Sequence, residues 1–184
     1  MGTLVAFEWL SLDGVFEADS MADWFFPYDS PGRRRTILET YQRADALLMG
    51  RTTYEMLAPS WSSMADDEMD GLAGVLTHTP KHIASDGPAI ADWGQTTTFG
   101  GDAVPEVQKL KDDGGTLMLI GSGALATTLA QAGLVDEYIL LVQPFVMGTG
   151  RRFIGEEMQT ALELVQVTQL DQGQLWLHYR VKRG

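Results

Sequence analysis

Two glycine-containing turns have the residue types needed to hold a phosphorylated ligand. The first is Gly50-Arg51-Thr52-Thr53, which follows a short apolar run and opens a helical pattern. The helix itself leaves the N–H groups at its start without partners, so they attract anions, and glycine lets a ligand approach the backbone closely. Thr52 and Thr53 add hydroxyl donors, and the Arg51 guanidinium suits a terminal phosphate such as the 2′-phosphate of NADPH. A capped helix with a surface arginine would also explain these residues.

The second turn is Gly121-Ser122-Gly123-Ala124-Leu125, which also follows a strand pattern and precedes a helical one. It is shorter than the Gly-x-Gly-x-x-Gly fingerprint, so by itself it is a weak signal. Two such turns in one chain form a stronger signal, because a dinucleotide has two ends to be held. Since open α/β sheets bind ligands at the carboxyl ends of their strands, the two turns together predict a dinucleotide site.

Several other side chains could serve a substrate. In Ser11-Leu12-Asp13-Gly14, the Asp13 carboxylate could relay a proton or bind an amine, or it could cap the turn. The Trp24-Phe25-Phe26 cluster could stack on a flat heterocycle, anchor a loop on the core or form a dimer contact. Arg33-Arg34-Arg35 could neutralise a phosphate, but three consecutive residues point around a helix, which favours a solvated face. Arg151-Arg152 could bind phosphate or close a loop.

Metal and hydrolase chemistry find no support in the sequence. The chain has no cysteine, and His78, His82 and His178 lack the spacing of metal ligands, so we interpret all three as structural and predict no metal site. Ser122 lies in Gly-Ser-Gly rather than in the Gly-x-Ser-x-Gly of a nucleophile elbow. The acidic run at residues 66–70 is typical of a solvated helix face.

The two turns depend on a strand and helix order that the apolar pattern indicates. Continuous apolar runs favour strands buried on both faces, and apolar residues at helical spacing favour helices. We expect strands at residues 3–10, 46–49, 81–85, 96–99, 116–120, 138–142, 162–170 and 174–181. We expect helices at residues 31–44, from about 52, and at 66–76, 103–111 and 123–132. This alternation predicts an α/β fold with a mixed, mostly parallel sheet, helices on both faces and a C-terminal antiparallel hairpin.

Length and charge limit the organisation and the partners. The 184 residues suit one domain over 1–184. The net charge of −12 disfavours binding to nucleic-acid phosphates. The N-terminal residues lack the pattern of a signal peptide, and no apolar run reaches the ~20 residues that cross a bilayer. We therefore expect a cytoplasmic protein that has no membrane association.

At its motifs the chain resembles the dihydrofolate reductase superfamily. Leu47-Leu48-Met49-Gly50-Arg51-x-Thr53-x-Glu55 is similar to the cofactor segment of that family, and Ile120-Gly121-Ser122-Gly123 is similar to its second glycine-rich turn. Residues 125–148 resemble the C-terminal reductase domain of the bifunctional riboflavin-biosynthesis deaminase/reductase. Residues 11–14, 44–51 and 101–102 look like the stand-alone bacterial proteins of this group.

This resemblance implies an eight-stranded sheet, NADPH as the hydride donor and frequent homodimers. By matching positions, Gly50, Arg51, Thr52 and Thr53 would hold the adenosine-side phosphates. Gly121, Ser122, Gly123, Ala124 and Leu125 would wrap the pyrophosphate and the nicotinamide side. Ser11 and Asp13 would lie where the first strand reaches the substrate and nicotinamide pocket.

The departures from the family concern the substrate. Dihydrofolate reductases have an acidic residue on the first helix that grips the pterin, and the corresponding positions here fall in Arg33-Arg34-Arg35. The riboflavin-pathway reductases carry a glutamate just before the second glycine turn, where this chain has Ile120. The sequence also lacks the cysteines and the His-x-Glu of a zinc deaminase site.

Taken together, the residues predict an NADPH-dependent reductase of a small heterocycle of pteridine or aminopyrimidine type. It would resemble 5-amino-6-(5-phosphoribosylamino)uracil reductase in the class of its reaction. We expect Ser11, Asp13, Trp24 and Phe25 to bind the substrate, with Asp13 or water as the proton source. The alternative is a non-catalytic protein that uses the same fold to bind a nucleotide or a heterocycle.

Overall fold

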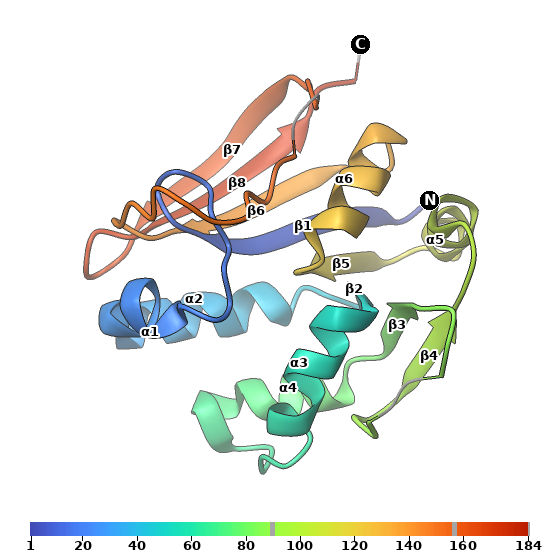
Figure 1. Ribbon diagram of the computed structural model, residues 1–184, viewed down its shortest axis with the longest axis horizontal. Coiled ribbons are helices and arrows are strands. Elements are labelled where there is room, and N and C mark those ends of the chain that lie inside the picture. Colours follow the sequence, from blue (N-terminus) through green and yellow to red (C-terminus); the bar gives the residue numbers. More distant parts are fainter. Residues whose placement is uncertain (89–90, 156–157, 184) are drawn as a thin grey trace.

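The computed structural model describes residues 1–88, 91–155 and 158–183. Its strands form one eight-stranded sheet in the order β4-β3-β2-β5-β1-β6-β8-β7 (Figure 1). The strands are β1 (Thr3–Leu10), β2 (Ala46–Gly50), β3 (Lys81–Ala84), β4 (Thr96–Phe99), β5 (Thr116–Ile120), β6 (Glu137–Val142), β7 (Leu162–Gln169) and β8 (Leu175–Val181). The helices are α1 (Met21–Trp24), α2 (Pro31–Tyr41), α3 (Arg51–Trp61), α4 (Leu72–His78), α5 (Ala103–Asp112) and α6 (Gly123–Gln131), with 3-10 turns η1 (Phe26–Tyr28) and η2 (Glu68–Gly71).

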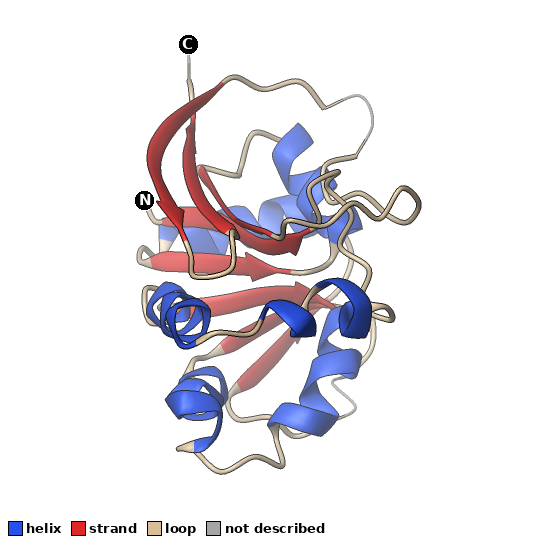
Figure 2. Ribbon diagram, turned by 90° about the vertical axis from the view of Figure 1, so that its left-hand side faces the viewer, coloured by secondary structure: helices blue, strands red, loops and turns tan. Residues whose placement is uncertain are grey.

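The sheet is parallel from β4 to β6 and antiparallel beyond it. All neighbouring pairs from β4 through β1 to β6 run parallel, whereas β8 pairs antiparallel with both β6 and β7. Parallel neighbours need long crossover connections, usually helices, and these cover the faces of the sheet. Figure 2 shows helices on both faces. The predicted fold class, including the C-terminal hairpin, is confirmed.

The two faces of the sheet pack into separate apolar cores. Side chains alternate along β1, so Val5 and Phe7 join one core while Leu4 and Ala6 join the other. The first core is closed by α2, α3 and α4, and the second by α5 and α6. Glu8 is the acidic residue in this otherwise apolar run, and it lies at the carboxyl end of β1, where the ligand turns were expected.

One segment differs from the expected elements. The single helix expected at residues 66–76 is instead η2 followed by α4, because Met69 and Asp70 have positive φ angles of 52° and 60°. The left-handed conformation interrupts a right-handed helix. The aromatic cluster Trp24-Phe25-Phe26 lies where α1 ends, at Trp24, and η1 begins, at Phe26. Among the residues described, no helix combines the length and apolar composition that a membrane span requires.

Candidate functional site

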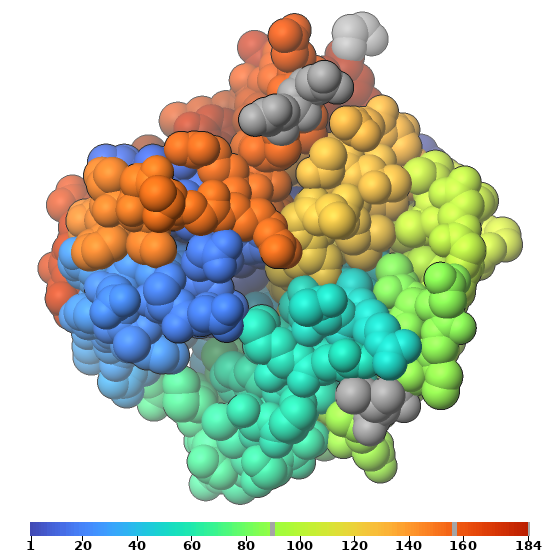
Figure 3. Space-filling model, viewed as in Figure 1, coloured from blue at the N-terminus to red at the C-terminus, as the bar shows by residue number. Residues whose placement is uncertain are grey.

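A cavity of about 590 Å³ lies at the carboxyl ends of β1, β2 and β5. In Figure 3 the surface is hollowed where the blue N-terminal segment, the cyan α3 and the gold α6 meet. All of the expected cofactor residues line this cavity, namely Gly50, Arg51, Thr52, Thr53, Gly121, Ser122, Gly123, Ala124 and Leu125. The two glycine turns, which are far apart in sequence, therefore face one shared space.

The two turns are joined directly through Ser122. Its Oγ accepts a hydrogen bond from the Gly50 N–H at 2.6 Å and lies 2.8 Å from Thr53 Oγ1. Ser122 has a left-handed backbone, with φ of 58° and ψ of 60°, a conformation that costs a residue with a side chain about 1 kcal/mol. The two hydrogen bonds offset that cost and fix the spacing of the turns.

The helices that start at the cavity lack side-chain caps. In α2, Ser30 accepts from the Arg33 N–H, and in α5, Asp102 accepts from the Val104 N–H. No side-chain cap is formed at the starts of α3 and α6, which follow Gly50 and Ser122. The first-turn N–H groups of α3 and α6 are therefore available to an anion at the positive end of each helix dipole.

The glycines of these turns pack so closely against other side chains that neither position has room for a Cβ atom. A Cβ atom on Gly121 would lie 2.7 Å from Thr53 Cγ2, and one on Gly123 would lie 2.6 Å from the Phe16 ring. Gly121 also has a φ of 57°, which favours glycine. This packing keeps the two turns close together, and the uncapped helix starts that follow them fit the phosphates of a dinucleotide of the NADPH type, which need free backbone N–H groups.

Charged side chains of both signs line the cavity. Arg51 and Arg151 supply the positive charge, and Glu8, Glu17 and Asp19 supply carboxyl groups. The Arg51 Nε atom pairs with Glu55 Oε1 at 2.5 Å, and the Arg51 side chain is about half exposed at 49%. An exposed ion pair contributes little to stability, so Arg51 can exchange this partner for a phosphate at small cost.

Aromatic side chains form another part of the cavity lining, the aromatic wall. Trp9, Trp24 and Tyr41 line the cavity, while Phe25 does not. Phe25 lies behind the wall and stacks on Trp9, with ring centroids 4.2 Å apart and an interplanar angle of 10°. Of the two aromatic residues expected at a substrate, Trp24 faces the cavity and Phe25 supports Trp9.

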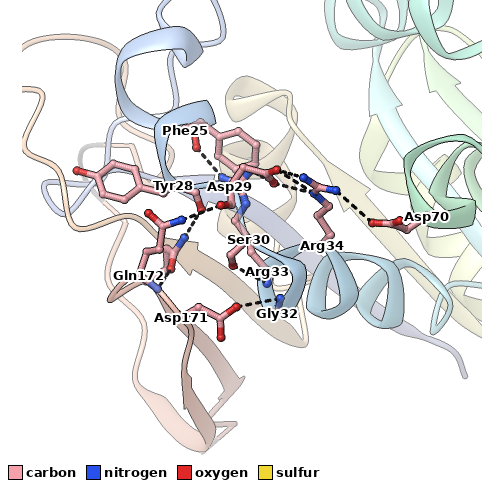
Figure 4. Close-up of polar contacts among 11 residues, drawn as sticks. Phe25, Tyr28, Asp29, Ser30, Gly32, Arg33, Arg34, Asp70, Asp171 and Gln172 are labelled. Carbon is pink, nitrogen blue, oxygen red and sulfur yellow. Dashed lines mark hydrogen bonds and ion pairs between the residues drawn. The ribbon is translucent and has the colours of Figure 1, made fainter.

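Arg33 holds Phe25, which packs on this aromatic wall through Trp9, and Figure 4 shows the contacts of Arg33 with Phe25 and Asp29. Its side chain is buried, with a residue exposure of 3%. Nη1 donates to the Phe25 carbonyl at 2.5 Å, Nη2 pairs with Asp29 at 2.8 Å, and the guanidinium lies 4.1 Å from the centre of the Phe25 ring. The prediction that these arginines lie on a solvated helix face is confirmed for Arg34 and Arg35, which are exposed, but it is wrong for Arg33.

Ser11 and Asp13 lie outside the cavity lining. The Asp13 carboxylate accepts hydrogen bonds from the N–H groups of Met147 (3.0 Å) and Gly148 (2.8 Å) and from the Ser11 hydroxyl (2.8 Å). These contacts, led by the Met147 N–H, lower the pKa of Asp13 to about 2. The carboxylate thus holds two loops together, and an ionised group of this kind is a poor proton donor at neutral pH.

Glu8 is a cavity residue that the motifs did not reveal. Its Oε1 accepts from the Trp9 N–H at 2.9 Å, while Oε2 is buried and has no hydrogen-bond partner among the described residues. Burial raises the pKa of Glu8 to about 8, because a low-dielectric site disfavours the charged form. The available sequence signal was a single carboxylate within the apolar run of residues 4–10.

Two curated relatives match over most of the chain. Both come from Bacillus subtilis strain 168 and are called uncharacterized proteins. YyaP is 25% identical over 173 residues, covering 92% of this chain and 90% of its own length. YwjB is 27% identical over 176 residues and covers 92% of both chains.

Solved structures share the fold at low sequence identity. A Shewanella sp. PV-4 protein provisionally assigned to riboflavin biosynthesis has a TM-score of 0.74 at 19% identity, covering 98% of this chain and 99% of that one. Acinetobacter baumannii RibD has a TM-score of 0.70 at 18% identity, covering 99% of this chain and 58% of its own. Enterococcus faecalis dihydrofolate reductase, solved with NADP(H), has a TM-score of 0.67 at 16% identity, covering 99% of this chain and 98% of its own.

A family model extends over nearly the whole chain. The model of the RibD C-terminal domain matches residues 3–176. This range contains the strands β1 to β7 and the start of β8, Leu175 and Trp176. The resemblance expected from the two glycine turns is thereby confirmed, and the chain belongs to the RibD C-terminal domain family.

Proposed function

We propose that the protein is an NADPH-dependent reductase of a small heterocycle of pteridine or aminopyrimidine type. The observation that carries this proposal is the link between Ser122 and Gly50, which brings two uncapped helix starts to one cavity. Gly50 to Thr53 would hold the adenosine-side phosphates, and Gly121 to Leu125 would hold the pyrophosphate and the nicotinamide side. The bound coenzyme would supply a hydride, and the protein would orient the reactants and exclude water.

The aromatic wall supports a flat substrate. Trp9, Trp24 and Tyr41 offer apolar ring surface in the same cavity that the glycine turns line. Aromatic faces stack on flat rings in offset or edge-on arrangements. A heterocycle held there would lie next to a nicotinamide held by the second turn.

Coenzyme titration tests the proposal. Binding of NADPH and NADH would be followed by the quenching of tryptophan fluorescence, since Trp9 and Trp24 line the cavity. We expect NADPH to bind more tightly, and Arg51→Ala to weaken it by about tenfold or more, because a charge-assisted hydrogen bond is lost. Arg35→Ala removes an exposed arginine of α2 that lies outside the lining and is the matched control. Equal affinities for the two coenzymes would contradict the proposed role of Arg51.

A glycine pair tests the second turn separately. Gly121→Ala introduces a Cβ atom 2.7 Å from Thr53, whereas Gly133→Ala, at a φ of 71°, meets nothing within 4 Å. Both substitutions add backbone strain, so only the difference between them reports on the cavity. We expect Gly121→Ala to weaken NADPH binding and Gly133→Ala to leave it unchanged. NADPH oxidation with a panel of pteridines and pyrimidines then separates a reductase from a non-catalytic binding protein, for which binding without turnover is the expected result.

A further inference from the structure

The sheet opens at the position of Glu8. The pairing of β1 with β5 ends at Phe7 and Ile120, whereas β1 continues along β6 as far as Leu10. The N–H groups of Trp9 and Gly121 both face the Glu8 carboxyl group in this opening. The carboxyl group therefore closes the gap between two diverging strands and forms part of the cavity lining.

One oxygen of this carboxyl group has no partner. The Trp9 N–H donates to Oε1, but Oε2 is buried without a hydrogen bond among the described residues. A carboxylate oxygen in that position would be costly, since buried polar groups are almost always paired. A protonated Oε2 would instead present an O–H donor to whatever enters the cavity.

The charged surroundings do not provide a cation for Glu8. The other titratable residues of the lining are Glu17 and Asp19 after β1, Tyr41 on α2, Arg51 on α3, and Arg151. Arg51 pairs with Glu55, and no positive charge is among the causes of the raised pKa of Glu8. The parts of β5 and α6 that line the cavity carry no charged side chain.

We propose that Glu8 is the proton-bearing group of this cavity, which holds a proton at Oε2 and donates it to an acceptor nitrogen or oxygen of the bound heterocycle. This inference rests on the proposed function and narrows its substrate class. The substrate must offer an imine nitrogen or a carbonyl oxygen toward β1. A cationic group at that position would meet a donor instead of an acceptor and would be rejected.

The same proton completes the reduction. When the carbon of a C=N bond gains a hydride, its π electrons move to the nitrogen, which must take up a proton. Glu8 supplies that proton from Oε2 and is left as a carboxylate, which water then reprotonates. The hydride comes from the reduced nicotinamide coenzyme of the proposed function, so atoms and electrons balance without a further reactant.

The protonation state can be measured without ligand. The protein labelled with 13C at its glutamate carboxyl carbons would be titrated by NMR, and Glu8→Gln would identify the Glu8 signal. We expect that signal to titrate near pH 8. Glu39→Gln, on the exposed side of α2, removes an equal charge and must leave the signal in place. A Glu8 signal that titrates near the ordinary value of 4.5 overturns the proposal.

Ring binding tests the donor. Quinoxaline and naphthalene have the same shape, but only quinoxaline has acceptor nitrogens. At pH 6 we expect the protein to prefer quinoxaline by about fivefold, the worth of one neutral hydrogen bond. This preference should disappear as the pH rises through about 8 and Glu8 ionises. Glu8→Met should abolish the preference, whereas Glu8→Gln, which keeps an N–H donor, should retain it at every pH. Equal binding of both rings by the unmodified protein at pH 6 overturns the proposal.

Failure of this inference is distinguishable from failure of the proposed function. NADPH titration of Glu8→Gln and Glu8→Met measures coenzyme binding independently of the ring experiment. A chain that fails to bind NADPH contradicts the reductase, while the NMR titration still decides the protonation of Glu8. If the protein binds NADPH but Glu8 is ionised at pH 6, the proposed reductase function stands and the proposed role of Glu8 as proton donor is overturned.

Discussion

The Ser122 hydroxyl lies 2.8 Å from the Thr53 hydroxyl and 2.6 Å from the Gly50 nitrogen, so one side chain joins the two glycine turns. Neither contact is local, because the partners are 69 and 72 residues apart in sequence. The spacing of the turns is therefore a property of the folded sheet. Any ligand that contacts both turns must match this spacing. Substitution of Ser122 therefore tests whether the two turns are energetically coupled.

A double-mutant cycle at this contact should be non-additive. We expect Ser122→Ala to cost about 2 kcal/mol of unfolding free energy, since it removes both hydrogen bonds, and Thr53→Val to cost about 1 kcal/mol. Thr53 acts mainly through Ser122, so the double variant should resemble Ser122→Ala. Urea denaturation of the four proteins provides the measurement. If the two single costs simply add, the hydroxyls act independently and the proposed coupling of the turns is wrong.

Most of the fold could be predicted because the apolar pattern is simple. Buried strands such as 116–120 are continuous apolar runs between clear turn residues, and every expected strand is present. The prediction of one helix at residues 66–76 was wrong because Met69 and Asp70 adopt left-handed backbone conformations ahead of Gly71. Helix propensity does not reveal such an interruption. Both η2 and α4 contact α2, and tertiary contacts of this kind can override local propensity.

The parts of the candidate site that depend on backbone conformation could be predicted from the sequence. The parts that depend on side-chain packing could not. Glycine at the end of a strand signals a turn by itself, so both turns could be found in the sequence. Trp24 and Phe25 are adjacent in sequence, but only Trp24 lines the cavity, while Phe25 contacts the buried Arg33 through its carbonyl and its ring. Glu8 stands in no motif, and its significance depends on the opening between β1 and β5.

Arg33 should be essential to the aromatic wall. Arg33→Met would leave the Phe25 carbonyl without its donor and would remove one of the two arginines that pair with Asp29. We expect a loss of about 2 kcal/mol in unfolding free energy. The wall itself should loosen, because Phe25 stacks on Trp9, and tryptophan emission should shift. Arg35→Met, on an exposed face of the same helix, is the matched control and should be nearly neutral. Similar stabilities for both variants would mean that Arg33 contributes no more than a surface residue.

Asp13 should act as an anchor between loops that depends on its charge. The pKa of Asp13 is lowered to about 2 from 3.8, mainly by the Met147 N–H. A lowered pKa gives stability that is present above pH 3.8 and lost as the pH falls toward 2. We expect Asp13→Asn to reduce this acid sensitivity and to speed amide exchange at Met147 and Gly148. Asp113→Asn, at the exposed end of α5, is the control, and unchanged exchange at both amides in Asp13→Asn would contradict the anchoring role.

Glu8 should make the protein less stable as the pH rises. Because burial raises the pKa of Glu8 from 4.5 to about 8, the folded state holds this proton more tightly than the unfolded chain. The resulting stability is complete below pH 4.5 and is lost as the pH approaches 8, with a slope of about 1.4 kcal/mol per pH unit at most. Glu8→Gln has no proton to lose, so the difference in unfolding free energy between the unmodified protein and this variant should shrink steadily over the same range. Urea denaturation at several pH values measures that difference, with Glu39→Gln as the control. If the difference in unfolding free energy stays constant with pH, Glu8 has the same pKa in the folded and unfolded states. Glu8 would then not hold a proton in the cavity at neutral pH.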